Sequence, residues 1–288
     1  MIFSRNKKAG IIFLLFFQFS LFANSQELYM QTEPASNMPK NSIGLRLTNK
    51  LFSESGTDLL RISPEIMYGI SGKWMVHIKQ TVILGEENKF YTGVSSLYAK
   101  YRFLSIDDVQ KHTRVALFGS IGYSKIQDLA GVHDILETNS SYSTGIIITQ
   151  LWHKLALSTT IGMYKPFANK NFDQSGNPGN VYNYSLSAGY LLLPVTYKSY
   201  NQTNLNAYLE ILGTTNRMKN YEETHIHKSE DVSQKFNRNQ VMIAPGLQAI
   251  FSSRTRMEGG YSFPFIQSKY SKGENMVMLR IEHLLFLK

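Results

Sequence analysis

The sequence of 288 residues contains no cysteine. This absence excludes disulfide bonds, thiolate metal sites, cysteine nucleophiles and a lipid anchor on an N-terminal cysteine. The sequence also lacks a Gly-x-Ser-x-Gly elbow and the glycine-rich motifs that bind phosphates and dinucleotides. No recognisable catalytic motif remains, so we expect neither an enzyme activity nor a cofactor.

Long hydrophobic runs are also scarce. The one long run covers residues 11–22, and it is too short for a transmembrane helix, which needs about 20 residues. Basic residues at 5, 7 and 8 precede it and the small residues of Ala23-Asn24-Ser25 follow it. This order is typical of a secretory signal peptide. We therefore predict a signal peptide over residues 1–25, with a buried N-terminal helix as the alternative.

The formal charge of the chain is +9. Three of the basic residues belong to the predicted signal peptide, which has no acidic residue, so the mature chain would carry +6. A basic exported protein can meet acidic lipid or an anionic solute. The excess is too diffuse to indicate a nucleic-acid partner.

Hydrophobic and polar residues alternate with a period of two through most of the chain. The clearest case is residues 240–266, where the alternation stops at Ser252-Ser253-Arg254 and then resumes, as in a β-hairpin. Pro245 interrupts this pattern, because a proline in a strand cannot donate a ladder hydrogen bond, and we expect a bulge or a weakly paired position there.

About twelve segments share this alternation, and each is near the 9 to 11 residues with which a tilted strand crosses a bilayer. Their apolar sets lie within residues 43–47, 60–70, 74–82, 97–103, 115–123, 142–152, 155–163, 182–192, 205–211, 241–251, 257–265 and 277–285. None of these sets contains Asp, Glu, Lys or Arg, so water is an improbable neighbour of this face. Aromatic residues near the strand ends on the same face resemble the girdles of membrane barrels.

Connections between these segments alternate in length. Short ones are expected at 71–73, 104–111, 152–154, 194–202 and 252–254, and longer ones at 52–58, 84–90, 125–140, 166–180, 214–237 and 267–274. Outer-membrane barrels have short periplasmic turns and longer external loops. We therefore predict an all-β fold, a transmembrane antiparallel up-and-down β-barrel of about 12 strands over residues 42–288. A secreted β-sandwich is the alternative.

Residues 26–41 contain two prolines and no clear periodicity. We predict an extended segment there, which lies either in the periplasm or in the entrance of the lumen.

The charged residues of the predicted strands fall on the face that would line the lumen. Ten are basic and four are acidic: Arg46, Lys50, Arg61, Lys79, Lys100, Arg102, Arg114, Lys154, Arg256 and Arg280 against Glu65, Glu210, Glu258 and Glu282. Folding each hairpin about its loop places Lys79 opposite Glu65, Glu65 near Arg46, and Glu258 near Glu282 with Arg280 one step away. We predict that these six residues form a belt across the lumen. The belt could select solutes, or it could be an ion-pair network that only holds the lumen together.

The longest loop contains His225 and His227 beside several carboxylates. Alternate histidines on an extended segment could bind a divalent ion. A solvated loop of mixed charge explains the same residues more simply, so we predict no metal site.

The signal peptide, the lead-in from Glu33 to Pro39 and the twelve amphipathic strands together resemble the outer-membrane β-barrel proteins of Gram-negative bacteria. Among these, the chain is similar to the MetA-like proteins of phenol-degradation clusters. The resemblance implies a transporter in the outer membrane, with lipid around it and a small solute as its partner. We expect a passive channel for anionic or aromatic solutes. The alternatives are a structural or adhesive barrel that binds a partner through its loops, or a lipid-modifying enzyme.

Overall fold

A computed structural model describes residues 29–54, 57–84, 89–124, 139–167, 179–196, 201–218, 236–268 and 274–287. Within these ranges the chain forms twelve strands and no helix able to span a membrane. The strands are β1 (Ser42–Glu54), β2 (Thr57–Gly69), β3 (Trp74–Leu84), β4 (Phe90–Asp108), β5 (Lys111–Tyr123), β6 (Ser141–Trp152), β7 (Leu155–Pro166), β8 (Val181–Leu193), β9 (Asn204–Met218), β10 (Phe236–Phe251), β11 (Thr255–Gln267) and β12 (Asn275–Phe286).

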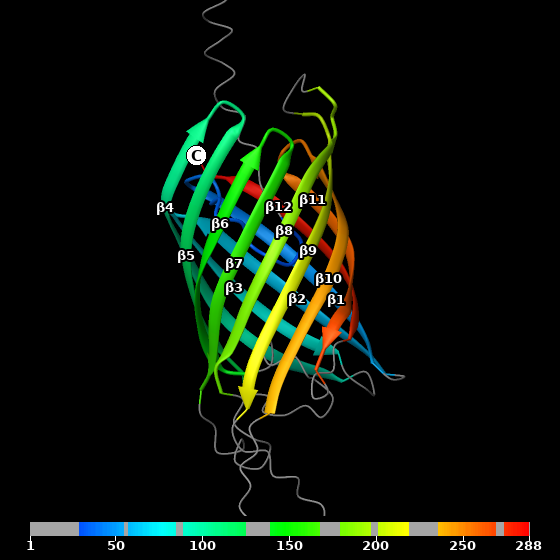
Figure 1. Ribbon diagram of the computed structural model, residues 1–288. Coiled ribbons are helices and arrows are strands. Elements are labelled where there is room, and N and C mark those ends of the chain that lie inside the picture. Colours follow the sequence, from blue (N-terminus) through cyan, green and yellow to red (C-terminus); the bar gives the residue numbers. More distant parts are fainter. Residues whose placement is uncertain are drawn as a thin grey trace, which may run out of the picture.

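Each strand pairs with its neighbours in the sequence, and β1 pairs with β12, so the sheet closes into a barrel (Figure 1). All pairs are antiparallel. The predicted fold class and strand number are confirmed.

The two faces of the wall differ as the alternation predicts. On β1, Leu45 and Leu47 are 45% and 38% exposed, whereas Arg46 between them is 9% exposed. The outward residues of the other strands form an apolar surface that includes Ile78 and Leu186. Because no charged side chain of the described residues interrupts the middle of this surface, the surface suits hydrocarbon rather than water.

Aromatic side chains lie at both edges of the apolar surface. At the end where β1 begins, the rings of Trp74 and Tyr101 are in contact at a tilt, with 4.6 Å between their centroids. At the other end, Tyr142 and Tyr182 are exposed on the outer face. These are the positions of the predicted girdles.

Most connections near the start of β1 and the end of β12 are short, at 70–73, 109–110, 153–154 and 252–254, whereas residues 194–203 form a longer one. At the other end most connections are longer, except for the two residues between β1 and β2. Two predicted boundaries are wrong. The predicted turn 104–111 shrinks to two residues because β4 contains a bulge between Arg102 and Leu104, after which the alternation continues on the opposite parity. The predicted loop 52–58 is also mostly strand, since β1 extends to Glu54 and β2 begins at Thr57.

Pro245 occupies a weakly paired position. It stands opposite Leu209 of β9, but the ladder between β10 and β11 passes from Ile243 to Gly246 without pairing the two residues between them. The bulge of this strand pair lies instead in β11, where Phe265 is the extra residue between the partners of Val241 and Met242. Pro245 has no N–H to donate, which accounts for the gap.

Residues 29–41, which we call the lumenal segment, form no strand and lie inside the barrel (Figure 1, dark blue). Tyr29, Met30 and Ala35 of this segment are at most 2% exposed. The segment contacts Lys100 on β4 and also lies against Gly246 on β10. These strands stand on opposite sides of the closed barrel, so the lumenal segment crosses the lumen.

Candidate functional site

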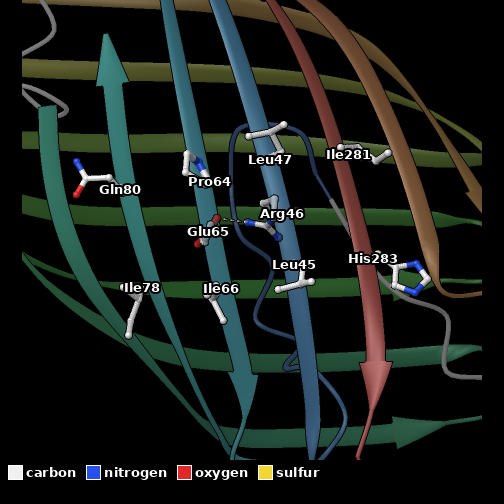
Figure 2. A pocket seen from close by; sticks show the side chains of 10 residues that line it. All are labelled: Leu45, Arg46, Leu47, Pro64, Glu65, Ile66, Ile78, Gln80, Ile281 and His283. Carbon is white, nitrogen blue, oxygen red and sulfur yellow. Dashed lines mark hydrogen bonds and ion pairs between the residues drawn. The ribbon is translucent and has the colours of Figure 1, made fainter. Parts of the chain in front are cut away.

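Arg46 of β1 is the centre of an ionic group on the inner wall. Its Nη1 lies 2.7 Å from Oε1 of Glu33 and 3.2 Å from Oε2 of Glu65, and its Nε lies 2.9 Å from Oε2 of Glu282. Glu65 and Glu282 stand directly opposite Arg46 on the two neighbouring strands, whereas Glu33 comes from the lumenal segment. Figure 2 shows Arg46 and Glu65 directed toward each other. The register of three strands therefore positions one guanidinium between carboxylates on both sides.

The ionic group continues along β11 and β12. Glu282 also accepts a hydrogen bond of 2.7 Å from Nη1 of Arg256. Nearby, Nη1 of Arg280 lies 3.2 Å from Oε2 of Glu258, whose other oxygen accepts a hydrogen bond of 2.6 Å from Nε2 of Gln248. These carboxylates are almost fully buried. Buried charges persist only with such partners.

Five of the six predicted belt residues take part in these contacts, and the sixth, Lys79, stands opposite Glu65 in the ladder. One expected neighbour is wrong: Glu258 stands opposite Arg280 rather than beside Glu282, which faces Arg256. The two strands pair asymmetrically about their connecting loop, which shifts the register from the one obtained by folding at its centre. Lys154 does not lie in the lumen either. It belongs to a turn at the rim, where its Nζ donates to the carbonyl oxygens of Pro194 and Val195.

Two basic side chains bind the middle of the lumenal segment. Nζ of Lys100 donates to the carbonyl oxygens of Pro34 and Ser36 at 2.6 and 2.8 Å and lies 3.8 Å from Oε2 of Glu33. Nη1 of Arg114 donates to the Ser36 hydroxyl at 2.8 Å. Lys100 has no exposed surface, so its charge is enclosed by the docked segment and the wall.

The start of the segment is bound by Glu210 of β9. This carboxylate accepts hydrogen bonds from the backbone N–H groups of Gln31 and Thr32 at 2.7 and 3.2 Å, and from the Thr32 hydroxyl at 2.8 Å. The Thr32 hydroxyl also lies 2.8 Å from that of Ser187. A buried carboxylate thus satisfies backbone donors that would otherwise lack partners in the lumen.

Met30 fits a notch in the opposite wall. Gly246 of β10 and Gly260 of β11 stand opposite each other in the ladder. A Cβ atom at these two positions would fall 1.9 Å from Met30 Sδ and 1.8 Å from Met30 Cε, respectively. The missing side chains therefore create the space that Met30 fills.

Glu33 lies outside the strands, and its side chain is 24% exposed. Burial raises the pKa of Glu33, but the positive charges of Arg46 and Lys100 outweigh that effect and hold the pKa well below its ordinary range. Glu33 is therefore bound as an anion.

Some residues of the site are absent from the predicted belt. The alternation already places Arg256 on the inner face, and His77 has the same inward parity as Lys79, so both residues could have been included in the belt. Nδ1 of His77 lies 2.7 Å from Oε1 of Glu65. Glu33 gave no comparable signal, because its segment has no periodicity. Glycines that face the lumen at paired positions, such as Gly246 and Gly260, indicate that another part of the chain packs closely against the wall there.

The weak metal candidates His225 and His227 lie outside the described residues. In the part of the chain that the structure describes, no three potential ligands gather into a metal site.

A hollow of about 520 Å³ lies on the outer face of β12, β1, β2 and β3. Figure 2 shows the apolar side chains around it, among them Leu45, Ile66 and Ile281. These side chains are exposed on the outer surface. The hollow therefore lies on the lipid side of the wall, and Arg46 and Glu65 of the ionic group are also among the residues that line it.

No protein-family model and no curated protein sequence matches the chain. Among solved structures, the COG4313 outer membrane channel from Pseudomonas putida F1 is similar, with a TM-score of 0.55 at 10% identity over 89% of this chain and 100% of that one. This chain has the outer-membrane barrel fold. The NanC porin gives a TM-score of 0.48 at 13% identity over 83% and 98% of the two chains. The MetA-like grouping stays a prediction.

Proposed function

We propose that the protein is a passive outer-membrane channel for small solutes and that the lumenal segment closes it in the state described here. The similar COG4313 protein is an outer membrane channel, and the apolar outer surface suits a bilayer. The observation that carries the proposal is the crossing of the lumen by residues 29–41, which polar contacts with the wall hold in place. Such contacts can be exchanged for water when the segment leaves.

The size of the barrel fits this function. Eight-stranded barrels have filled interiors and sixteen-stranded porins have aqueous channels, so twelve strands leave an intermediate lumen. A single extended segment is enough to obstruct such a lumen. Its removal would leave a passage lined by the charged residues of the wall.

The charge of the wall favours small anions as solutes. Arg46, Arg61, Lys100, Arg114 and Arg256 are all buried inside the barrel. The buried carboxylates on the strands are Glu210, Glu258 and Glu282. In a narrow passage, water screens such an excess less than bulk solution does.

A reversible cross-link tests the closure. The hydroxyl oxygens of Thr32 and Ser187 are 2.8 Å apart, and the chain has no cysteine of its own. A Thr32→Cys, Ser187→Cys double variant would therefore form a disulfide that fixes the segment in the lumen. In planar bilayers we expect the oxidised protein to be silent and the reduced protein to conduct. The single variant Thr32→Cys is the control, and its conductance should be the same in both redox states.

Equal conductance in both redox states would show that the segment does not close the lumen. Silence in both states, with a heat-modifiable barrel present on a detergent gel, would refute the channel.

Selectivity tests the solute class. Under a salt gradient the reversal potential of the conducting protein should indicate anion preference, and Lys79→Glu should weaken that preference because it reverses a charge on the inner face opposite Glu65. A cation-selective parent would refute the assignment to anions.

A further inference from the structure

We propose that the position of the Glu33 carboxylate is a binding site for the carboxylate group of a small solute, so that the lumenal segment acts as a tethered ligand of its own channel. This inference rests on the proposed function, since the site becomes available only when the segment leaves the lumen.

Two cations from separated strands contact the Glu33 carboxylate. Arg46 of β1 is 2.7 Å from one of its oxygens and Lys100 of β4 is 3.8 Å from the other. Both basic side chains are at most 8% exposed. A guanidinium at such a distance makes a charge-assisted hydrogen bond, and such bonds are among the strongest that a carboxylate accepts.

The wall holds Arg46 in place without Glu33. Glu65 and Glu282, on the strands to either side, bind the guanidinium at 3.2 and 2.9 Å. When the segment leaves, these two contacts remain because all three residues belong to the barrel. The site is therefore preorganised for another carboxylate.

In the contacts between Arg46, Lys100, Arg256 and their carboxylates, positive and negative charges are equal in number while Glu33 is bound. Arg46, Lys100 and Arg256 carry three positive charges, and the carboxylates in contact with them are Glu33, Glu65 and Glu282. Departure of Glu33 leaves one uncompensated positive charge on the wall of the narrow lumen. An anion from solution restores the balance.

Two polar groups without hydrogen-bond partners lie near the position of the Glu33 carboxylate. Nε2 of His77 and the Tyr98 hydroxyl are buried and have no hydrogen-bond partner among the described residues. The two rings are 4.9 Å apart, and Nδ1 of His77 is already occupied by Glu65. Buried polar atoms without partners are rare in folded proteins. A solute that is larger than its carboxylate group could form hydrogen bonds with His77 and Tyr98, whereas Glu33 forms none with them.

Acetate provides a direct test, because Glu33→Ala removes a CH2–COO⁻ unit of the same size. We expect acetate to raise the melting temperature of the full-length Glu33→Ala protein in a saturable manner, and acetamide to have no effect. Wild type and Glu33→Gln should not respond, since their own side chains fill the site. Adding Arg46→Gln to Glu33→Ala should weaken acetate binding about tenfold or more, the factor expected for a lost charged hydrogen bond.

Permeation separates a transport site from a merely structural one. In a Gly260→Ala background, which weakens segment docking, Arg46→Gln should lower the permeability of acetate relative to chloride. Arg61, whose guanidinium lies over the Phe52 ring, is a buried arginine of the wall that does not contact Glu33. Arg61→Gln is the matched control: it should reduce the permeability of both anions alike and so leave their ratio unchanged.

The inference is overturned if acetate does not stabilise Glu33→Ala, or if both arginine variants change the permeability ratio equally. Should Glu33→Ala fail to form a barrel, the permeability ratio alone decides. These failures differ from failure of the channel itself, which appears as a silent reduced Thr32→Cys, Ser187→Cys protein.

Discussion

Met30 of the lumenal segment occupies the space that Gly260 of β11 leaves free, and a Cβ atom at position 260 would lie 1.8 Å from Met30 Cε. This contact joins a segment without regular structure to the ladder of the barrel wall. It also makes the docking of the segment sensitive to one methyl group.

Gly260→Ala should displace Met30 and weaken docking of the segment, because the new methyl group also meets the Pro245 carbonyl oxygen and cannot move aside. Hydrogen exchange of the Gln31 and Ala35 amides, which both donate to wall side chains, should become faster. Gly119→Ala is the control, since its nearest atom is 3.7 Å away. Unchanged exchange in Gly260→Ala would mean that the notch does not hold the segment.

Glu210→Gln should release the start of the segment more than its middle. The substituted amide offers one acceptor oxygen to the three donors of Gln31 and Thr32, and its NH2 group opposes the backbone N–H groups. We expect docking to weaken by about 1–3 kcal/mol, measured as faster exchange at Gln31 and Thr32. Ser187→Ala removes one hydroxyl contact with Thr32 and a longer one of 3.3 Å with Glu210, and it should have a smaller effect. An equal effect of both variants would contradict the central role of the Glu210 carboxylate.

The alternation of side chains was enough to predict the barrel because one rule applies along every strand. A residue such as Leu186 faces lipid and its neighbour Ser187 faces the lumen wherever the strand continues. The rule fails where the backbone inserts a residue, as at the bulge near Leu104, and the sequence there shows no glycine or proline to announce the change.

The site was less accessible to sequence reasoning. A short connection fixes the register of two neighbouring strands, so cross-strand partners such as Arg46 and Glu65 can be predicted from the sequence. Glu33 does not, because a segment that crosses the lumen meets residues distant in sequence and obeys no period. Its position depends on the three-dimensional fit of Met30, the Glu210 carboxylate and Lys100, which no local pattern encodes.

Acidification should undock the segment. The pKa of Glu33 falls from its ordinary value of 4.5 when it is bound by Arg46 and Lys100, so binding is fully stabilised above pH 4.5 and weakens progressively as the pH falls below that value. We expect more frequent channel openings at pH 3 than at pH 7. Glu33→Gln should remove the part of this response that belongs to Glu33, even though carboxylates of the wall also titrate. The same acid response in both proteins would contradict the assignment.

Leu186→Arg should destabilise the folded protein in lipid by about 2–4 kcal/mol, the cost of a basic residue near the bilayer midplane. Leu186 is 52% exposed on the outer face, in the middle of β8, and stands between Thr159 and Ile211 of the neighbouring strands. Leu193, at the end of the same strand, is 50% exposed and should tolerate arginine at a cost of about 0–1 kcal/mol, because its charge reaches the interface. Equilibrium unfolding in urea from lipid vesicles measures both free energies. Equal costs at the two positions would mean that depth in the membrane does not decide them, and the outer face of β8 would then have water rather than lipid as its neighbour.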